Sequence, residues 1–139
     1  MSHYTQPMTV EYAHTDMAGI VHFSEFFKYM EAAEHRFFRS MGLSINAEID
    51  GRHISWPRIA CSFEYHQPLR FEDQFVMNLT IEKIGNSSVT YKCDVLLDGE
   101  LMATGQTTSV CCEVTPGKPL GKVPIPDSIR TAFEKSMNS

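Results

Sequence analysis

The sequence predicts an α+β domain over residues 1–139, with a five-stranded antiparallel sheet packed against one long helix and a short helix at the C-terminus. One long segment has the periodicity of an amphipathic helix, a strand-like segment precedes it, and four strand-like segments follow it in succession. The length suits one domain with a single core. One helix covers only one face of such a sheet, so the other face and the edges stay exposed. We therefore expect the chain to self-associate.

The elements in the first third of the chain have clear periodic patterns. A first strand is predicted over residues 8–14, where apolar and polar side chains alternate, so that Tyr12 and His14 would share one face. The long helix is predicted over Ser24–Met41, because apolar residues recur there at three- and four-residue spacing. Its first residue suits an N-cap, and Gly42 suits the left-handed residue that follows a helix.

The rest of the chain predicts an antiparallel meander. Gly85-Asn86 and Asp98-Gly99 separate the last three strand-like segments and predict hairpin turns. A loop is expected over residues 43–57, and prolines keep the stretch after the last strand irregular until a short helix over residues 128–137. The four strand-like segments are rich in Val, Ile, Thr, Phe or Tyr and cover residues 58–66, 74–84, 88–97 and 101–114.

Composition and charge exclude several classes of protein. Hydrophobic residues make up 42% and charged residues 21%, a balance typical of globular chains. The net charge of −5 argues against nucleic-acid binding, which depends on neutralising phosphates. No apolar stretch approaches the ~20 residues of a membrane span, and the N-terminus lacks the pattern of a signal peptide, so a cytoplasmic location is expected. The four cysteines form no CxxC pair, which favours buried free thiols over a metal site.

The most informative segment is the turn that precedes the long helix. It places the carboxylate of Asp16 a few residues before the helix, whose first turn has unpaired backbone amides and the positive end of the helix dipole. Gly19 lets the backbone approach a ligand closely. Acyl transfer requires a carboxylate to drive the attack and fixed donors to stabilise the oxyanion. The alternative is that Asp16 only stabilises the turn.

The residues around this turn resemble the signature of a known family. This signature is similar to that of the 4-hydroxybenzoyl-CoA thioesterase family, which includes short-chain acyl-CoA thioesterases of bacteria. The resemblance implies a hot-dog fold, in which the sheet wraps around the long helix, and assembly as a homodimer or homotetramer. It also implies hydrolysis of an acyl-CoA without a cofactor, because coenzyme A is part of the substrate. The matching run is Tyr12-x-x-Thr15-Asp16-x-Ala18-Gly19-Ile20-Val21-x-Phe23, followed by Tyr29-Met30-Glu31-Ala32-Ala33.

The resemblance further implies roles for individual residues. Asp16 would act as general base or nucleophile on the thioester, and the backbone N–H near Phe23 would polarise its carbonyl. Tyr12, Gly19 and His22 are candidates for the pocket. His22 is shifted by one position from the histidine that some relatives show, so a structural role is the alternative for this residue. For Tyr12, the alternative is a position in the core.

Other residues have less specific expectations. We expect Glu31 to support the site or an interface, and Glu34 to face solvent. The acyl group is not readable from the sequence. Candidates to contact the nucleotide of coenzyme A are Arg58, Arg70, Lys118 and Lys122, and candidates for an aromatic pocket are Phe23, Phe26, Phe27, Trp56 and Phe63.

Two alternative functions are open at this level. One is a hot-dog enoyl-CoA hydratase, which uses an Asp and His pair joined by an Asn-Pro segment. Here Asp16 and His22 are six positions apart and joined by Met-Ala-Gly-Ile-Val, which counts against it. The other is a protein that binds an acyl ligand without turnover.

Overall fold

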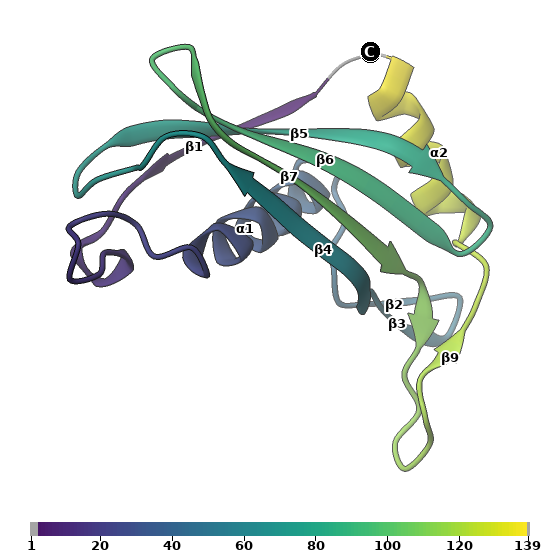
Figure 1. Ribbon diagram of the computed structural model, residues 1–139. Coiled ribbons are helices and arrows are strands. Elements are labelled where there is room, and N and C mark those ends of the chain that lie inside the picture. The colour runs from purple at the N-terminus through teal and green to yellow at the C-terminus, as the bar shows by residue number, and fades with distance from the viewer. Residues whose placement is uncertain (1–2, 139) are drawn as a thin grey trace.

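A curved antiparallel sheet of five strands lies across the long helix α1 (Glu25–Ser40), as Figure 1 shows for the computed structural model, which describes residues 3–138. The strand order is β1-β5-β6-β7-β4, and all four pairings are antiparallel. The predicted meander forms the middle of the sheet, and β1 and β4 are its edges. The strands are β1 (Tyr4–Thr9), β4 (Arg58–Tyr65), β5 (Gln74–Ile84), β6 (Ser88–Leu97) and β7 (Glu100–Val110).

The helix and the inner face of the sheet form the core. Alternate residues of β5 from Phe75 to Ile81 and of β6 from Val89 to Val95 are buried in this core, as the alternation predicts. Full burial of a large apolar side chain stabilises the fold by about 1.5–3 kcal/mol. The outer face of the central strand carries Thr90, Lys92 and Asp94, so water can cover it. The helix contributes Phe26, Tyr29, Met30, Ala33, Phe37 and Phe38 to the core.

The aromatic side chain of Phe63 packs the edge strand β4 against α1 and β7. The ring of Phe63 packs on those of Phe26 and Phe27, with centroid distances of 5.7 and 5.2 Å. Its neighbour across the strand pair is Gly105 of β7. A Cβ atom at Gly105 would lie 2.6 Å from the Phe63 ring, so only glycine leaves room for this packing.

A second, small sheet occupies part of the expected loop over residues 43–57, so that prediction is wrong. Its order is β2-β3-β8-β9. The β2–β3 turn at Asp50-Gly51 has positive φ at both residues, 54° and 76°. The strands are β2 (Ala47–Ile49), β3 (Arg52–Ser55), β8 (Cys112–Glu113) and β9 (Gly121–Lys122).

The C-terminal helix α2 (Asp127–Asn138) packs on the core beside β5 (Figure 1). Its buried Phe133 lies 5.6 Å from Phe38 and 5.9 Å from Trp56, measured between ring centroids. The predicted helix over residues 128–137 is therefore confirmed within one residue at each end. No helix among residues 3–138 is long and apolar enough to cross a membrane.

The N-terminal strand differs from its prediction. β1 ends at Thr9, and residues Tyr12–His14 form a 3-10 turn, η1, in place of the strand expected over residues 8–14. The pairing with the sheet ends at Val10, whose amide and carbonyl bond to residues 72–73. Thr15 then donates its amide and hydroxyl to the Tyr12 carbonyl, at 3.1 and 2.7 Å. The turn therefore aims the next residues away from the sheet.

The ends of α1 confirm one capping prediction and correct the other. Gly42 has a φ of 75°, the left-handed conformation expected after a helix. Ser24 precedes the first helical residue, but its hydroxyl makes no capping bond to the helix. It lies 2.7 Å from Nδ1 of His22. The Asp98-Gly99 hairpin is confirmed, with positive φ at both residues.

Glu34 lies inside the protein, which corrects the expectation that it faces solvent. It is 1% exposed, and its Oε1 accepts a hydrogen bond of 2.7 Å from Arg58. Arg58 also donates to Ser109, at 3.2 Å, and lies 3.6 Å from Glu31. Burial raises the pKa of Glu34, while the bond to Arg58 opposes this shift. The guanidinium of Arg58 thus pairs with two carboxylates of α1, those of Glu34 and Glu31.

Candidate active site

The turn that carries Asp16 is a small, closed loop between η1 and α1. Its base is a bridge between Thr15 and Val21. The Asp16 amide donates to the Ile20 carbonyl at 2.9 Å, and the Gly19 amide donates back to the Asp16 carbonyl at 2.9 Å. Gly19 has a φ of 79°, which an L side chain rarely adopts. The sequence therefore fixes the position of the carboxylate through backbone bonds.

Only one oxygen of the Asp16 carboxylate is hydrogen-bonded within this loop. Its Oδ1 accepts a hydrogen bond from the Ala18 amide at 2.9 Å. Its Oδ2 has no hydrogen-bond partner among residues 3–138, so one oxygen is available to a substrate or a water. Asp16 lines a cavity of about 410 Å³, whose other walls are Ile20, Val21, Phe23, Phe26, Tyr65, His66, Gln67 and Pro68.

A free backbone donor lies just before α1. Phe23 lines the same cavity as Asp16, and its amide has no acceptor in the described part of the chain. Its carbonyl accepts a hydrogen bond of 3.0 Å from the Tyr65 hydroxyl, which holds this peptide in place. The amide also lies at the positive end of the α1 dipole. Asp16 and Phe23 thus line one cavity, and they carry a free carboxylate oxygen and a free amide donor, the two groups that acyl transfer requires.

The far wall of the cavity comes from β4 and the residues that follow it. The Tyr65 ring packs on Phe26 with a centroid distance of 5.1 Å. Burial raises the pKa of Tyr65, so its hydroxyl stays a donor. The Val21 amide donates to the Leu69 carbonyl at 2.8 Å and ties the Asp16 loop to this segment. Tyr65, His66 and Gln67 were not predicted as site residues, because no local motif marks a contact made across more than 40 positions.

The remaining predicted pocket residues, Tyr12, Gly19 and His22, are not among the residues that line this cavity. Tyr12 is 76% exposed and its ring packs on Phe71. Gly19 forms the loop turn. The His22 side chain bonds to Ser24 and packs against the Phe23 ring at 4.5 Å, so it is turned toward the helix start. Of the expected aromatic residues, Phe23 and Phe26 line the cavity, and Trp56 lies in the core near α2.

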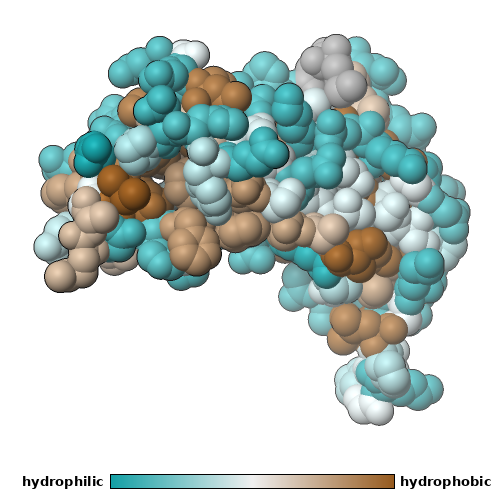
Figure 2. Space-filling view, viewed as in Figure 1, coloured by the Kyte–Doolittle hydropathy of each residue, from teal (hydrophilic) through white to brown (hydrophobic). Residues whose placement is uncertain are grey.

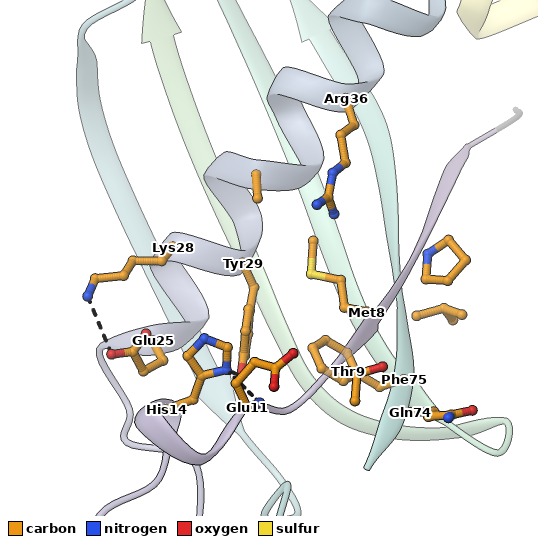
Figure 3. A pocket seen from close by; sticks show the side chains of 13 residues that line it. Met8, Thr9, Glu11, His14, Glu25, Lys28, Tyr29, Arg36, Gln74 and Phe75 are labelled. Atoms are coloured by element: carbon orange, nitrogen blue, oxygen red, sulfur yellow. Dashed lines mark hydrogen bonds and ion pairs between the residues drawn. The ribbon is translucent and has the colours of Figure 1, made fainter. Parts of the chain in front are cut away.

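A larger cavity of about 790 Å³ lies between α1 and strands β1 and β5 (Figure 3). Its lining is mixed, with charged Glu11, Glu25, Lys28 and Arg36 around an apolar floor that includes Phe75. No cluster of three or more His, Cys, Asp or Glu among the described residues could hold a metal ion, in this cavity or elsewhere.

Comparison with known proteins identifies the family. The model of the thioesterase-like superfamily matches residues 10–133. The chain belongs to this superfamily. The match includes the Asp16 loop, α1 and all of the strands from β4 to β9, so the thioesterase-like assignment covers the whole candidate site.

Named members of the family are similar to the chain over most of its length. A 1,4-dihydroxy-2-naphthoyl-CoA hydrolase from Synechocystis sp. is 29% identical over 137 residues, which cover 96% of each protein. A solved 1,4-dihydroxy-2-naphthoyl-CoA thioesterase from Synechocystis superposes with a TM-score of 0.84 at 25% identity and covers 95% of this chain and 96% of its own. A solved gentisyl-coenzyme A thioesterase has a TM-score of 0.82 at 25% identity, with 94% and 99% covered. These neighbours confirm the hot-dog fold.

Proposed function

We propose that the protein hydrolyses an acyl-CoA thioester to the free acid and coenzyme A. One observation carries this proposal: Asp16, which has an unpaired carboxylate oxygen, and Phe23, which has a free amide, line the same cavity. The thioester carbonyl would accept a hydrogen bond from this amide at the start of α1, which stabilises the oxyanion that develops during attack. Membership of the thioesterase-like superfamily supports the same reaction.

Two routes for Asp16 satisfy this geometry. As general base, Asp16 takes a proton from water while the water oxygen bonds to the carbonyl carbon; the C–S bond then breaks and the proton passes to the departing thiolate. As nucleophile, the carboxylate oxygen bonds to the carbonyl carbon and expels the thiolate, and water then hydrolyses the resulting anhydride. Both routes consume one water, release one acid and one thiol, and need no metal or cofactor.

The acyl group that fits the cavity best is aromatic. The walls around Asp16 are largely apolar and include the rings of Phe23, Phe26 and Tyr65. Such rings bind a flat aromatic group through edge and face contacts. The relatives named above include thioesterases of 1,4-dihydroxy-2-naphthoyl-CoA and of gentisyl-coenzyme A. We therefore place aromatic acyl-CoAs ahead of short or long aliphatic ones.

A panel of acyl-CoAs tests the proposed function. Thiol release is followed with a thiol-reactive dye for benzoyl, naphthoyl, short-chain and long-chain thioesters. We expect the highest kcat/KM with an aromatic thioester. Loss of enoyl absorbance from crotonyl-CoA without thiol release would indicate the hydratase alternative. Binding of the panel without thiol release would indicate a non-catalytic binding protein, and either result would contradict the proposal.

The active form is proposed to be a homodimer, or a tetramer of two such dimers, that pairs along β4. Strand β4 has one neighbour, β7, in the described sheet, so its other edge has unpaired backbone groups that favour strand addition. Ile59 is 67% exposed and Tyr65 is 45% exposed along this edge. Figure 2 shows a band of hydrophobic surface in the region where Figure 1 places β4. A second copy would cover this band and the cavity wall that contains Tyr65.

A charge at this edge tests the dimer. Ile59→Lys places a charge on the β4 edge of each copy, where a strand-paired partner would desolvate it, so we expect the dissociation constant of the dimer to rise by at least ~10-fold. Sedimentation velocity over a concentration series measures this shift. Leu120→Lys is the matched control, because Leu120 is 54% exposed but lies on the β8–β9 connection. A monomeric wild-type protein, or equal dissociation of both variants, would contradict pairing through β4.

A cytoplasmic location is part of the same proposal. All four cysteines are free, and Cys93, Cys111 and Cys112 are buried. Burial raises the pKa of Cys93 to about 12 and that of Cys111 to about 11, so these thiols stay protonated and unreactive. Free thiols are typical of proteins in a reducing compartment.

A further inference from the structure

We propose that a hydrogen-bonded pair, His14 and Tyr29, positions Asp16 and the Phe23 amide relative to each other. This inference rests on the proposed hydrolysis at Asp16. Neither residue lines the Asp16 cavity; both line the larger cavity beside it (Figure 3). Both act through the loop, so they are positioning residues.

The backbone of His14 joins the two halves of the site. Its carbonyl accepts a hydrogen bond of 3.0 Å from the His22 amide. Asp16 follows His14 by two positions, and Phe23 follows His22 by one. The Asp16 carboxylate and the Phe23 amide therefore both lie next to the backbone hydrogen bond between His14 and His22. A displacement of His14 would move the carboxylate relative to the amide donor.

The side chain of His14 fixes this backbone pair to the rest of the protein. Its Nδ1 accepts a hydrogen bond of 3.0 Å from the Glu11 amide, which can only donate. Nδ1 therefore has no proton, and the Tyr29 hydroxyl, 2.8 Å away, is the second donor to it. The ring N–H of this tautomer is therefore at Nε2. Figure 3 shows His14, Glu11 and Tyr29 grouped beneath the first turns of α1.

Tyr29 is a rigid support for the imidazole. It is 5% exposed, and its ring packs edge-on against His14 and in a tilted arrangement against Phe75 of β5, both with centroid distances of 5.0 Å. Burial, with the carboxylates of Glu25 and Glu11, raises the pKa of Tyr29, so its hydroxyl stays a donor. The pair thus connects the Asp16 loop to α1 and, through α1, to the sheet.

Loss of the hydrogen bond between His14 and Tyr29 would leave the fold unchanged, but it would make the position of the Asp16 loop less well defined. Because the Tyr29 ring remains in Tyr29→Phe, packing is retained and only the hydrogen bond is removed. Small displacements of a catalytic group lower kcat strongly while substrate binding is retained. The expected effect is a decrease of kcat by about tenfold, with KM changed by less than about twofold. Tyr4→Phe is the matched control, because its hydroxyl bonds to Gln6 on β1, away from the loop.

A double-mutant cycle in kcat tests the pair directly. His14→Ala removes the acceptor, and the double variant His14→Ala/Tyr29→Phe should lose no more activity than His14→Ala alone, because both changes break one interaction. His14→Asn keeps an acceptor near the position of Nδ1 and should retain most of the activity, so it serves if the alanine variant fails to fold. Melting temperatures of all variants identify losses that come from unfolding.

Several results would overturn the inference. An unchanged kcat in Tyr29→Phe, single effects that multiply in the double variant, or an equal loss in Tyr4→Phe would each do so. Asp16→Asn is measured beside these variants. If Asp16→Asn is inactive and Tyr29→Phe is fully active, only the positioning inference fails. If Asp16→Asn is as active as wild type, the proposed role of Asp16 fails, and the positioning inference fails with it.

Discussion

Asp16→Asn is expected to lower the turnover of acyl-CoA by at least ~100-fold, with substrate affinity close to that of wild type. Asparagine has nearly the shape of aspartate and can still accept the hydrogen bond from the Ala18 amide, so the loop should keep its conformation. It cannot take a proton from water or attack the carbonyl carbon. Single-turnover thiol release measures the chemical step, and equilibrium binding of an unreactive CoA thioether measures affinity.

Asp98→Asn is the matched control for this prediction. Asp98 has a φ of 50° in the β6–β7 hairpin, a conformation that asparagine adopts readily. This variant makes the same chemical change on the surface and should hydrolyse as fast as wild type. Near-normal turnover in Asp16→Asn or Asp16→Ala would show that another group drives the reaction.

Arg58→Met is expected to destabilise the protein by about 3 kcal/mol at pH 8, the typical cost of leaving one buried partner of an ion pair uncompensated. Glu34 would lose its bond to Arg58 in this variant, and its second oxygen, Oε2, has no partner in the described structure. Urea unfolding followed by circular dichroism measures the loss. Glu31→Gln is the matched control, because Glu31 is exposed and lies 3.6 Å from the same guanidinium. Glu31→Gln should lower the free energy of unfolding by less than about 1 kcal/mol.

The loss in Arg58→Met should also depend on pH. Burial raises the pKa of Glu34, and the bond and charge of Arg58 oppose that shift in the wild type. Without Arg58, the folded-state pKa of Glu34 should rise further above its unfolded value. A group with a raised folded-state pKa contributes stability at low pH that is lost as pH rises through the folded-state value. The variant should therefore be closer to wild type at pH 5 than at pH 8, and a pH-independent difference would contradict this account.

The sequence predicted the main sheet well, because local signals specify it. The hydrophobic alternation of residues 74–84 and 88–97 agrees with β5 and β6 at both ends, and Asp98-Gly99 forms the predicted hairpin. The apolar stripe likewise located α1. The short strands β2 and β3 were missed because two segments of three or four residues have too few positions to show a period.

Interactions between segments that are distant in the chain could not be predicted from local sequence patterns. The polar pattern of α1 gave no reason to bury Glu34, because its partner Arg58 comes from an edge strand. Likewise, nothing near Tyr65 indicates that its hydroxyl holds the Phe23 carbonyl. The Asp16 loop was recognisable because its residues are contiguous. The wall opposite Asp16 was not, since the fold alone brings the residues after β4 to the start of α1.

A crystal structure with an unreactive CoA thioether would show where the acyl group lies relative to Asp16. We expect the acyl group in the cavity of about 410 Å³, its carbonyl oxygen within hydrogen-bonding distance of the Phe23 amide, and the Asp16 carboxylate facing the carbonyl carbon. An acyl group bound in the cavity of about 790 Å³ beside Tyr29, with Asp16 out of reach, would contradict this expectation.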